Sequence, residues 1–313
     1  MRKTINQTYI EGYVYSHKLE CKTSGAQSKN PGTPFIKGSL DIATNEDCTN
    51  TITVNFTYVT ELTKNGQKNR NYEVLSKIIN RQLFNVIEDG KEKATKVKIN
   101  SAFGLNEWFD KENGELVSRV MNDGGFITVI SSFEKPEDQR NSFKADMLIT
   151  KVNRKEANEE KEEPERMTVK GFIFNFRKEI LPIEFTVYNT VAMDYFEDHD
   201  FTMSPLFTQV GGSQDSLVFK KTEIEESAFG DDIVNEVTRY RKALVIKFAR
   251  KTPYEWDSEE DITALEVKEA IANRELMLAT KKKERDEYLK SIASTPASPA
   301  PAPTPVAAGG FNW

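Results

Sequence analysis

The chain has 313 residues, of which 29% are charged, and its formal net charge is −6 at pH 7. This length allows two domains with hydrophobic cores of their own. The sequence contains no apolar run near the ~20 residues that cross a bilayer, and no apolar segment typical of a signal peptide. We therefore expect a protein of the cytoplasm, or of the host cytoplasm if the gene is viral, with no membrane contact. The acidic balance also argues against a strongly basic DNA-binding domain.

The charges are distributed unevenly along the chain. Residues 1–150 carry 20 Lys and Arg against 19 Asp and Glu, whereas residues 167–250 carry 10 against 13. A nearly neutral unit can bind a polyanion if its cations share one face, so the first part of the chain is the better candidate. Cys21 and Cys48 are expected to be free thiols in a cytosolic protein. Without a C-x-x-C pair we expect neither a metal site nor a cofactor.

The hydrophobic pattern predicts mostly strands, followed by one long helix. Alternation of apolar and polar residues is typical of a strand with one buried face. It is clearest over 51–60, where Phe56 shares the apolar side and is expected in the core. Apolar spacing over 72–83 predicts a helix between the third and fourth strands. The expected strands, in chain order, are 9–20, 35–44, 51–60, 96–99, 126–133, 143–152, 169–179 and 182–189.

Two pairs of stretches resemble each other without a gap. Ile10-Glu11-Gly12-Tyr13-Val14-Tyr15 matches Val169-Lys170-Gly171-Phe172-Ile173-Phe174, and Leu148–Lys155 matches Leu244–Lys251. Unless the similarity arose by chance, it predicts a tandem repeat of two β units that open and close alike. A Gly at the same place in both copies indicates a bulge or a tight bend. We expect Phe172, Phe174 and Phe176 to make a hydrophobic contact, either with the C-terminal helix or with the other barrel.

These patterns divide the chain into five parts. They are a first barrel at 1–155, a charged linker at 156–166, a second and shorter barrel at 167–251, a helical segment at 252–293 and a tail at 294–313. The linker also has the composition of a long exposed hairpin. The tail is rich in Ser, Ala and Pro, which predicts disorder. Its last residues are Phe311, Asn312 and Trp313, and two aromatic rings on a flexible tether predict a peptide offered to a partner protein.

Five strands with a helix between the third and fourth suggest an OB-fold, a small Greek-key barrel. The stretch FIKGSLDIATNEDCTNTITVNFTYV at 35–59, placed after YIEGYVYSHKLE at 9–20, resembles the second and third strands of the bacterial and phage single-stranded DNA-binding proteins. Leu40, Ala43 and Thr44 fit the "F-x-x-A-T" strand of that family. The resemblance implies OB-like barrels and a tail whose hydrophobic tip binds partners. The tip of that family is acidic, whereas this one carries only the terminal carboxylate.

Binding of a single strand requires cations along the phosphates and rings that stack on the bases, at about 1–3 kcal/mol per stacked base. The first unit supplies both kinds of side chain, although rings also fill cores and interfaces. The candidate nucleic-acid-binding residues are Tyr13, Tyr15, Lys18, Lys37, Lys64, Lys68, Arg70, Tyr72, Lys96, Lys98 and Trp108. The second unit, which is shorter and more acidic, is expected to be largely structural.

Two functions fit these observations. The first is a sequence-independent single-stranded DNA-binding protein that acts in replication, recombination or repair and recruits partner proteins through its tail. The second is a structural or adaptor protein, of a virus for instance, whose barrels bind other proteins. The sequence has no nucleotide-binding or catalytic motif, so we do not expect an enzyme. Oligomers are compatible with either function, and OB-folds bind both DNA and RNA.

Overall fold

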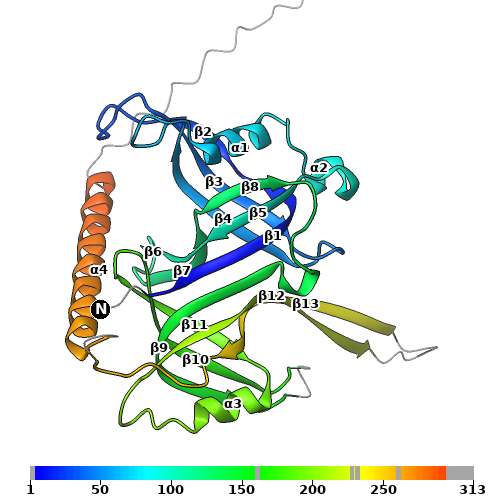
Figure 1. The fold of residues 1–313 in the computed structure, drawn as a ribbon, viewed down its shortest axis with the longest axis vertical. Helices are drawn as coiled ribbons and strands as arrows, with labels where there is room; N and C mark the ends of the chain where they lie inside the picture. Colours follow the sequence, from blue (N-terminus) through cyan, green and yellow to red (C-terminus); the bar gives the residue numbers. More distant parts are fainter. Residues whose placement is uncertain (1–3, 159–162, 226–228, 230–232, 259–261, 294–313) are drawn as a thin grey trace, which may run out of the picture.

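The computed structural model describes residues 4–158, 163–225, 229, 233–258 and 262–293. Within these residues the chain is mostly β, with one long helix at the C-terminal end, α4 (Ala264–Ala293), so the predicted fold class is confirmed (Figure 1). None of the described helices is both long and apolar enough to cross a membrane. The predicted tail at 294–313 lies outside the described residues.

The first part of the chain folds into a five-stranded barrel. Its elements are β1 (Asn6–His17), β2 (Glu20–Thr23), β3 (Pro34–Ala43), β4 (Thr51–Thr60), α1 (Arg70–Ile79), α2 (Val86–Asp89), η1 (Lys91–Lys93), β5 (Lys96–Ser101), β6 (Phe103–Phe109), β7 (Leu116–Asp123) and β8 (Phe126–Ile130). β1 pairs antiparallel with β3 and β5, β3 pairs with β4, and β5 pairs with β8. The ring closes where β4 runs parallel to the end of β7. The five barrel positions are therefore β1, β3, β4, β5 and a fifth that the consecutive strands β7 and β8 share. This order, with α1 after the third barrel strand, is that of an OB-fold.

Gly124 and Gly125 connect β7, which pairs with β4, to β8, which pairs with β5. The N–H of Gly124 donates to the carbonyl of Asn55 in β4 at 2.7 Å, and Phe126 already pairs with Asn100 in β5. Gly124 and Gly125 adopt φ values of 62° and 114°, which residues with a Cβ rarely adopt. A Cβ on Gly125 would lie 2.2 Å from the carbonyl oxygen of Asn100.

The second barrel has the same strand order. Its elements are β9 (Asn141–Lys155), β10 (Arg166–Phe174), β11 (Ile180–Val187), α3 (Thr190–Glu197), β12 (Leu206–Glu225) and β13 (Ile233–Ala249). β9 pairs with β10 and β12, β10 pairs with β11, and β11 runs parallel to β13, which pairs with β12. Past Gly212, β12 pairs only with β13, and the two strands form an arm that projects from the barrel (Figure 1).

The strand pairing divides the chain differently from the sequence-based expectation. A boundary at residue 155 assigns β9 to the first unit, but β9 is the first strand of the second barrel and also pairs with β1. The described parts of the expected linker, 156–158 and 163–166, belong to the β9–β10 hairpin, in which Arg154 pairs with Met167 and Asn158 with Glu163, as the alternative interpretation of this segment expected. The cause is pairing between strands distant in sequence, which the local pattern of each strand does not specify.

The two similar Gly-containing stretches are not equivalent strands, because they form the first strand of one barrel and the second strand of the other. Their glycines nevertheless have the same physical role. A Cβ on Gly12 would lie 2.0 Å from the carbonyl oxygen of Ala43, and a Cβ on Gly171 would lie 2.1 Å from that of Leu148. Both strands carry a register shift nearby, as expected for a bulged strand that passes close to its neighbour.

Each barrel has a separate hydrophobic core, and α4 runs along both barrels (Figure 1). Phe56, at 2% exposure, lies in the first core, which confirms the prediction from its strand pattern. On the outside of the second barrel, Phe172 and Phe174 pack against Ile262, just before α4, and Val267 in its first turn. Phe176 is exposed in the β10–β11 turn, so two of the three phenylalanines make the expected contact.

Candidate nucleic-acid interface

A pair of rings, the half-buried Phe35 and the exposed Tyr58, lies on the outer face of β3 and β4. The centroids of Phe35 and Tyr58 are 4.5 Å apart and their planes are inclined by 38°. Tyr58 is 50% exposed, and its hydroxyl lies 2.9 Å from Oγ of Ser24. In OB-folds the second and third strands and the adjoining loops bind oligonucleotides, and β3 and β4 are those strands here. The ring pair therefore occupies the face on which a ligand of this fold is expected.

Cations surround this ring pair. Lys22 is the register partner of Phe35, and Lys37 is that of Glu20. Lys22 forms an ion pair with Glu20 at 2.8 Å, and its hydrogen bond and charge lower the pKa of that carboxyl. The loop after β4 adds the exposed Lys64 and Lys68, and the first residue of α1 adds the exposed Arg70, all three predicted for the site from the sequence. This loop leaves β4 at Thr60, the register partner of Phe35, so it begins at the same end of the face.

The middle of the face carries a carboxylate. Asp41 accepts a hydrogen bond from Oγ of Ser16 at 2.8 Å and another from Oγ1 of Thr53 at 2.6 Å. Its neighbours Leu40 and Ile42 point into the core, which places Asp41 on the outside. A negative charge at this position opposes a phosphate backbone, so the favourable contacts lie at the two ends of the face.

At its other end the face reaches a cavity of about 690 Å³ between the barrels. Thr51, Thr53 and Asn55 from β4 line one side, and Glu184 and Thr186 from β11 line another. The remaining walls come from the β6–β7 hairpin, β12 and β13. β11 is the third barrel strand of its unit, as β4 is of the first, so the outer faces of corresponding strands meet at this cavity.

Four side-chain amides, which we call the amide cluster (Asn50, Asn122, Asn141 and Gln214), hold the barrels together beside the cavity. Nδ2 of Asn122 donates to Oε1 of Gln214 at 2.9 Å, and Nε2 of Gln214 donates to Oδ1 of Asn122 at 2.8 Å. The backbone N–H of Gln214 donates to Oδ1 of Asn141, and its carbonyl accepts from Nδ2 of Asn50, both at 3.1 Å. Because these groups satisfy one another, they fix the geometry of the cavity.

The cavity also contains three cations, Arg119 from β7 and Arg241 and Lys242 from β13. Arg119 lies 5.2 Å from the ring centroid of Trp108, a predicted site residue on β6, and Nζ of Lys242 donates to the carbonyl of Thr51 at 3.0 Å. The two carboxylates in the wall have lysine partners that do not line it. Glu184 pairs with Lys170 at 2.9 Å and Asp215 pairs with Lys247 at 3.1 Å. The cavity is therefore net cationic.

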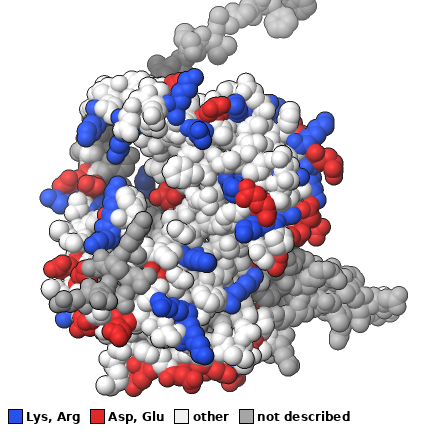
Figure 2. Space-filling view, viewed as in Figure 1, with Lys and Arg blue, Asp and Glu red and all other residues white. Residues whose placement is uncertain are grey.

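Outside the cavity, the surface carries positive and negative side chains together. Figure 2 shows Lys and Arg spread over the face seen in Figure 1, with Asp and Glu gathered along its lower edge, where α3 lies. A polyanion site in this molecule is thus defined by local groups on the face of β3 and β4 and in the cavity, and not by a large basic field.

Four predicted site residues lie elsewhere, on the side of β1 and β5 that the 131–140 segment covers. They are Tyr13, Tyr15, Lys96 and Lys98. Tyr13 is 7% exposed and donates to Glu46 at 3.1 Å, and burial is the main reason that its pKa is raised. Lys96 lies over the rings of Tyr13 and Phe133, and Lys98 pairs with Glu134 at 2.5 Å. These groups stabilise the first barrel and are not presented to a strand on the outer face of β3 and β4.

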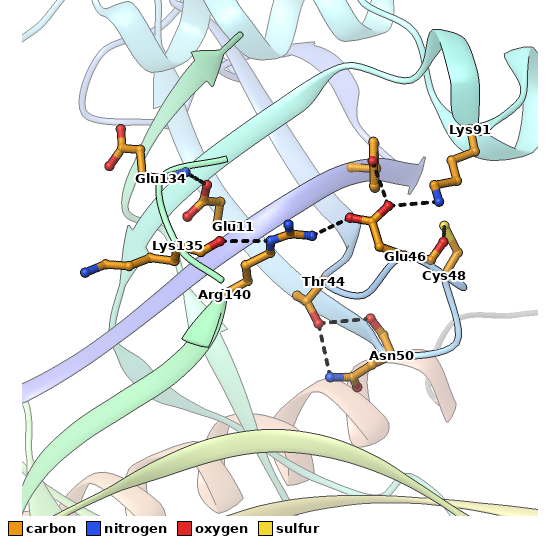
Figure 3. Close-up of polar contacts among 10 residues, drawn as sticks. Glu11, Thr44, Glu46, Cys48, Asn50, Lys91, Glu134, Lys135 and Arg140 are labelled. Atoms are coloured by element: carbon orange, nitrogen blue, oxygen red, sulfur yellow. Dashed lines mark hydrogen bonds and ion pairs between the residues drawn. The ribbon is translucent and has the colours of Figure 1, made fainter. Parts of the chain in front are cut away.

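Glu46 is the centre of this polar network (Figure 3). Nη1 of Arg140 donates to it at 2.7 Å and Nζ of Lys91 at 2.9 Å, and these hydrogen bonds lower the pKa of Glu46 to about 2. Glu46 lies in the β3–β4 turn together with Thr44 and Asn50, whose side chains bond each other at 3.1 Å. Since Asn50 belongs to the amide cluster, the network on the far side of the turn helps to position the cavity.

The remaining predicted residues are dispersed. Tyr72 on α1 packs against the first core, and Lys18 is exposed at the end of β1. Phe311, Asn312 and Trp313 lie outside the described residues. Sequence reasoning missed six charged or aromatic residues of the interface: Lys22, Phe35, Tyr58, Arg119, Arg241 and Lys242. Gly38 is the sequence feature that could have indicated the exposure of Tyr58. It has a φ of 128° and lies at the register shift between β3 and β4, past which Tyr58 points outward.

The fold and this face together define a double-barrel protein of the OB type. The chain belongs to the YorF family, which it matches over residues 4–284. No curated protein matches it.

Among solved structures, a deletion variant of the single-stranded DNA binding protein from Thermus aquaticus has a TM-score of 0.45 and 12% identity, and covers 83% of this chain and 100% of its own. The wild-type form has a TM-score of 0.46 and 10% identity, and covers 81% and 96%.

Proposed function

We propose that this chain binds single-stranded DNA without regard to sequence, on the outer face of β3 and β4. The observation that carries the proposal is the pair of the half-buried Phe35 and the exposed Tyr58, with Lys22 and Lys37 beside it, on a face that ends at a cationic cavity. Rings that stack on bases tolerate every base, because each base has a flat π face. Cations at both ends of the face can neutralise the phosphates on either side of the stacked bases.

The same proposal extends to the biological role. A protein that holds single strands serves replication, recombination or repair, and acts by binding alone, with no catalytic step. The residues at 294–313 then recruit partner proteins through Phe311, Asn312 and Trp313. Deletion of 294–313 should remove such interactions and leave the affinity for DNA unchanged, because the ring pair and the cavity lie in other parts of the chain.

The test is a fluorescence-anisotropy titration of a labelled oligo-dT with the full chain at two salt concentrations. We expect binding that weakens as salt rises, since bound cations release counterions from the phosphates, and little competition from duplex DNA. An oligo-rU of equal length tests the preference for DNA. Failure to bind any single strand at low salt would overturn the proposal, and protein complexes that form without nucleic acid would then favour an adaptor.

A further inference from the structure

We propose that the cavity between the barrels binds one nucleotide of the bound strand, with its phosphate on Arg119, Arg241 and Lys242 and its base against the side-chain amides of Asn55 and Asn106. This inference rests on the proposed function and adds a second kind of contact to it. The ring pair on β3 and β4 stacks bases, whereas the cavity would enclose a single nucleotide. The second barrel would then take part in binding through β13, in contrast to the structural role expected from its sequence.

The size and position of the cavity fit such a ligand. Its volume of about 690 Å³ lies within the range of about 300–1,000 Å³ for small-molecule sites, which concentrate where domains meet. The walls come from both barrels and from the β6–β7 hairpin. The amide cluster and the hydrogen bond from Lys242 to Thr51 hold these walls in place, so the site is formed before a ligand arrives.

The charges specify an anion. Because Glu184 and Asp215 are paired with lysines that do not line the cavity, the cations in it are not neutralised by its own carboxylates. Among the described residues, neither Arg119 nor Arg241 has an ion pair. A guanidinium presents two parallel N–H donors that match two phosphate oxygens. Two such groups, one from each barrel, are placed to bind one phosphate from different sides.

Other wall residues specify more than an anion. The carboxamides of Asn55 and Asn106 make no hydrogen bond through their side chains to the described residues, unlike those of the amide cluster. A carboxamide offers a donor and an acceptor side by side, which is the pattern that the edges of bases present. Phe103, Val120 and Leu244 add apolar wall, which suits the face of a base and is of no use to an inorganic ion.

The experiment is isothermal titration of the full chain with dTMP, thymidine and inorganic phosphate at low salt. We expect dTMP to bind at least about tenfold more tightly than either thymidine or phosphate, which corresponds to about 1.4 kcal/mol. Arg241→Gln should weaken dTMP binding by about tenfold or more. The matched control is Arg177→Gln, which removes the same charge from the exposed β10–β11 turn, where Arg177 lies over Phe176, and should have no effect. Asn106→Ala should weaken dTMP binding and leave phosphate binding unchanged.

The outcomes separate this inference from the proposed function. If oligo-dT binds but dTMP does not at millimolar concentration, the cavity is not a nucleotide site and the proposed function stands. If phosphate binds as tightly as dTMP, the cavity is an anion site only, and the inference fails. If dTMP binds and depends on Arg241 while oligo-dT does not bind, the cavity is a nucleotide site and the proposed function fails. Unchanged melting temperatures of the variants show that lost binding is not lost folding.

Discussion

The outer faces of the two barrels use their aromatic residues in opposite ways. On the first barrel, Phe35 and Tyr58 form a pair on β3 and β4 with Tyr58 half exposed. On the second, Phe172 and Phe174 of the corresponding β10 are covered by the segment that leads into α4. The same fold thus presents one face to solvent and closes the other with its own chain. An aromatic residue on an OB-type face is therefore a binding candidate only where no other segment of the chain covers it.

The largest expected effect is on the covered face. Phe174 is 1% exposed, and Phe174→Ala should lower the free energy of unfolding by about 3–5 kcal/mol, because it removes a ring and leaves a cavity. Its affinity for oligo-dT, measured under folding conditions, should not change. Phe176→Ala is the matched control, since that ring is 90% exposed two residues further on. Urea unfolding measures both variants, and equal stabilities would show that the C-terminal segment does not cover this face.

The second effect concerns the attachment of α4 to the first barrel. Arg274 on α4 forms a two-pronged ion pair with the buried Glu107 on β6, at 2.7 and 2.5 Å. Removal of one partner leaves a buried charge without its partner, so Arg274→Ala should cost about 3 kcal/mol by urea unfolding. The control is Lys282→Ala, since Lys282 is exposed on α4 and makes no ion pair among the described residues. A loss below about 0.5 kcal/mol would mean that solvent reaches the pair.

The same pair predicts a pH dependence. Burial alone would raise the pKa of Glu107, but hydrogen bonds from Arg274 and Ser118 and the charges of Arg274 and Lys281 outweigh it and lower the pKa. A carboxyl whose pKa is lowered on folding stabilises the fold fully above its ordinary value of 4.5, and that contribution is lost as the pH falls through the lowered pKa. In Arg274→Ala this acid-sensitive part should shrink, because only the hydrogen bond from Ser118 and the charge of Lys281 then oppose the effect of burial on the carboxyl.

The third effect falls on the open face and on binding. Tyr58→Ala should weaken oligo-dT binding by about 1–3 kcal/mol, the usual contribution of one stacked base. Its stability should change by less than that of Phe174→Ala, since Tyr58 is half exposed. Anisotropy titration measures the affinity, and Phe176→Ala serves again as the control with an exposed ring on the other barrel. An affinity equal to that of the wild type would show that the ring pair stacks no base.

This contrast between faces explains what the sequence could predict. Alternation over Thr51–Thr60 gave the bounds of β4 and the burial of Phe56, because a strand pattern is local. Strand alternation could not show that Tyr13 is buried and Tyr58 exposed, since the exposure of each ring depends on which distant segment covers it. Glu46 and Phe133 cover Tyr13, whereas the register shift between Ile36 and Gly38 accompanies the exposure of Tyr58. The cavity joins residues from Asn50 to Leu244, a proximity that only the closed barrels produce.

The smallest expected effect tests the middle of the open face. Asp41→Asn removes the negative charge and keeps its hydrogen bonds, because the hydroxyls of Ser16 and Thr53 can accept as well as donate. If DNA crosses this face, the affinity for oligo-dT should rise by about 0.5 kcal/mol, and the gain should shrink at high salt. Asp198→Asn, which makes the same change beyond α3 on the second barrel, should leave the affinity unchanged. Equal gains from both variants would mean that net charge, and not the path over β3 and β4, controls binding.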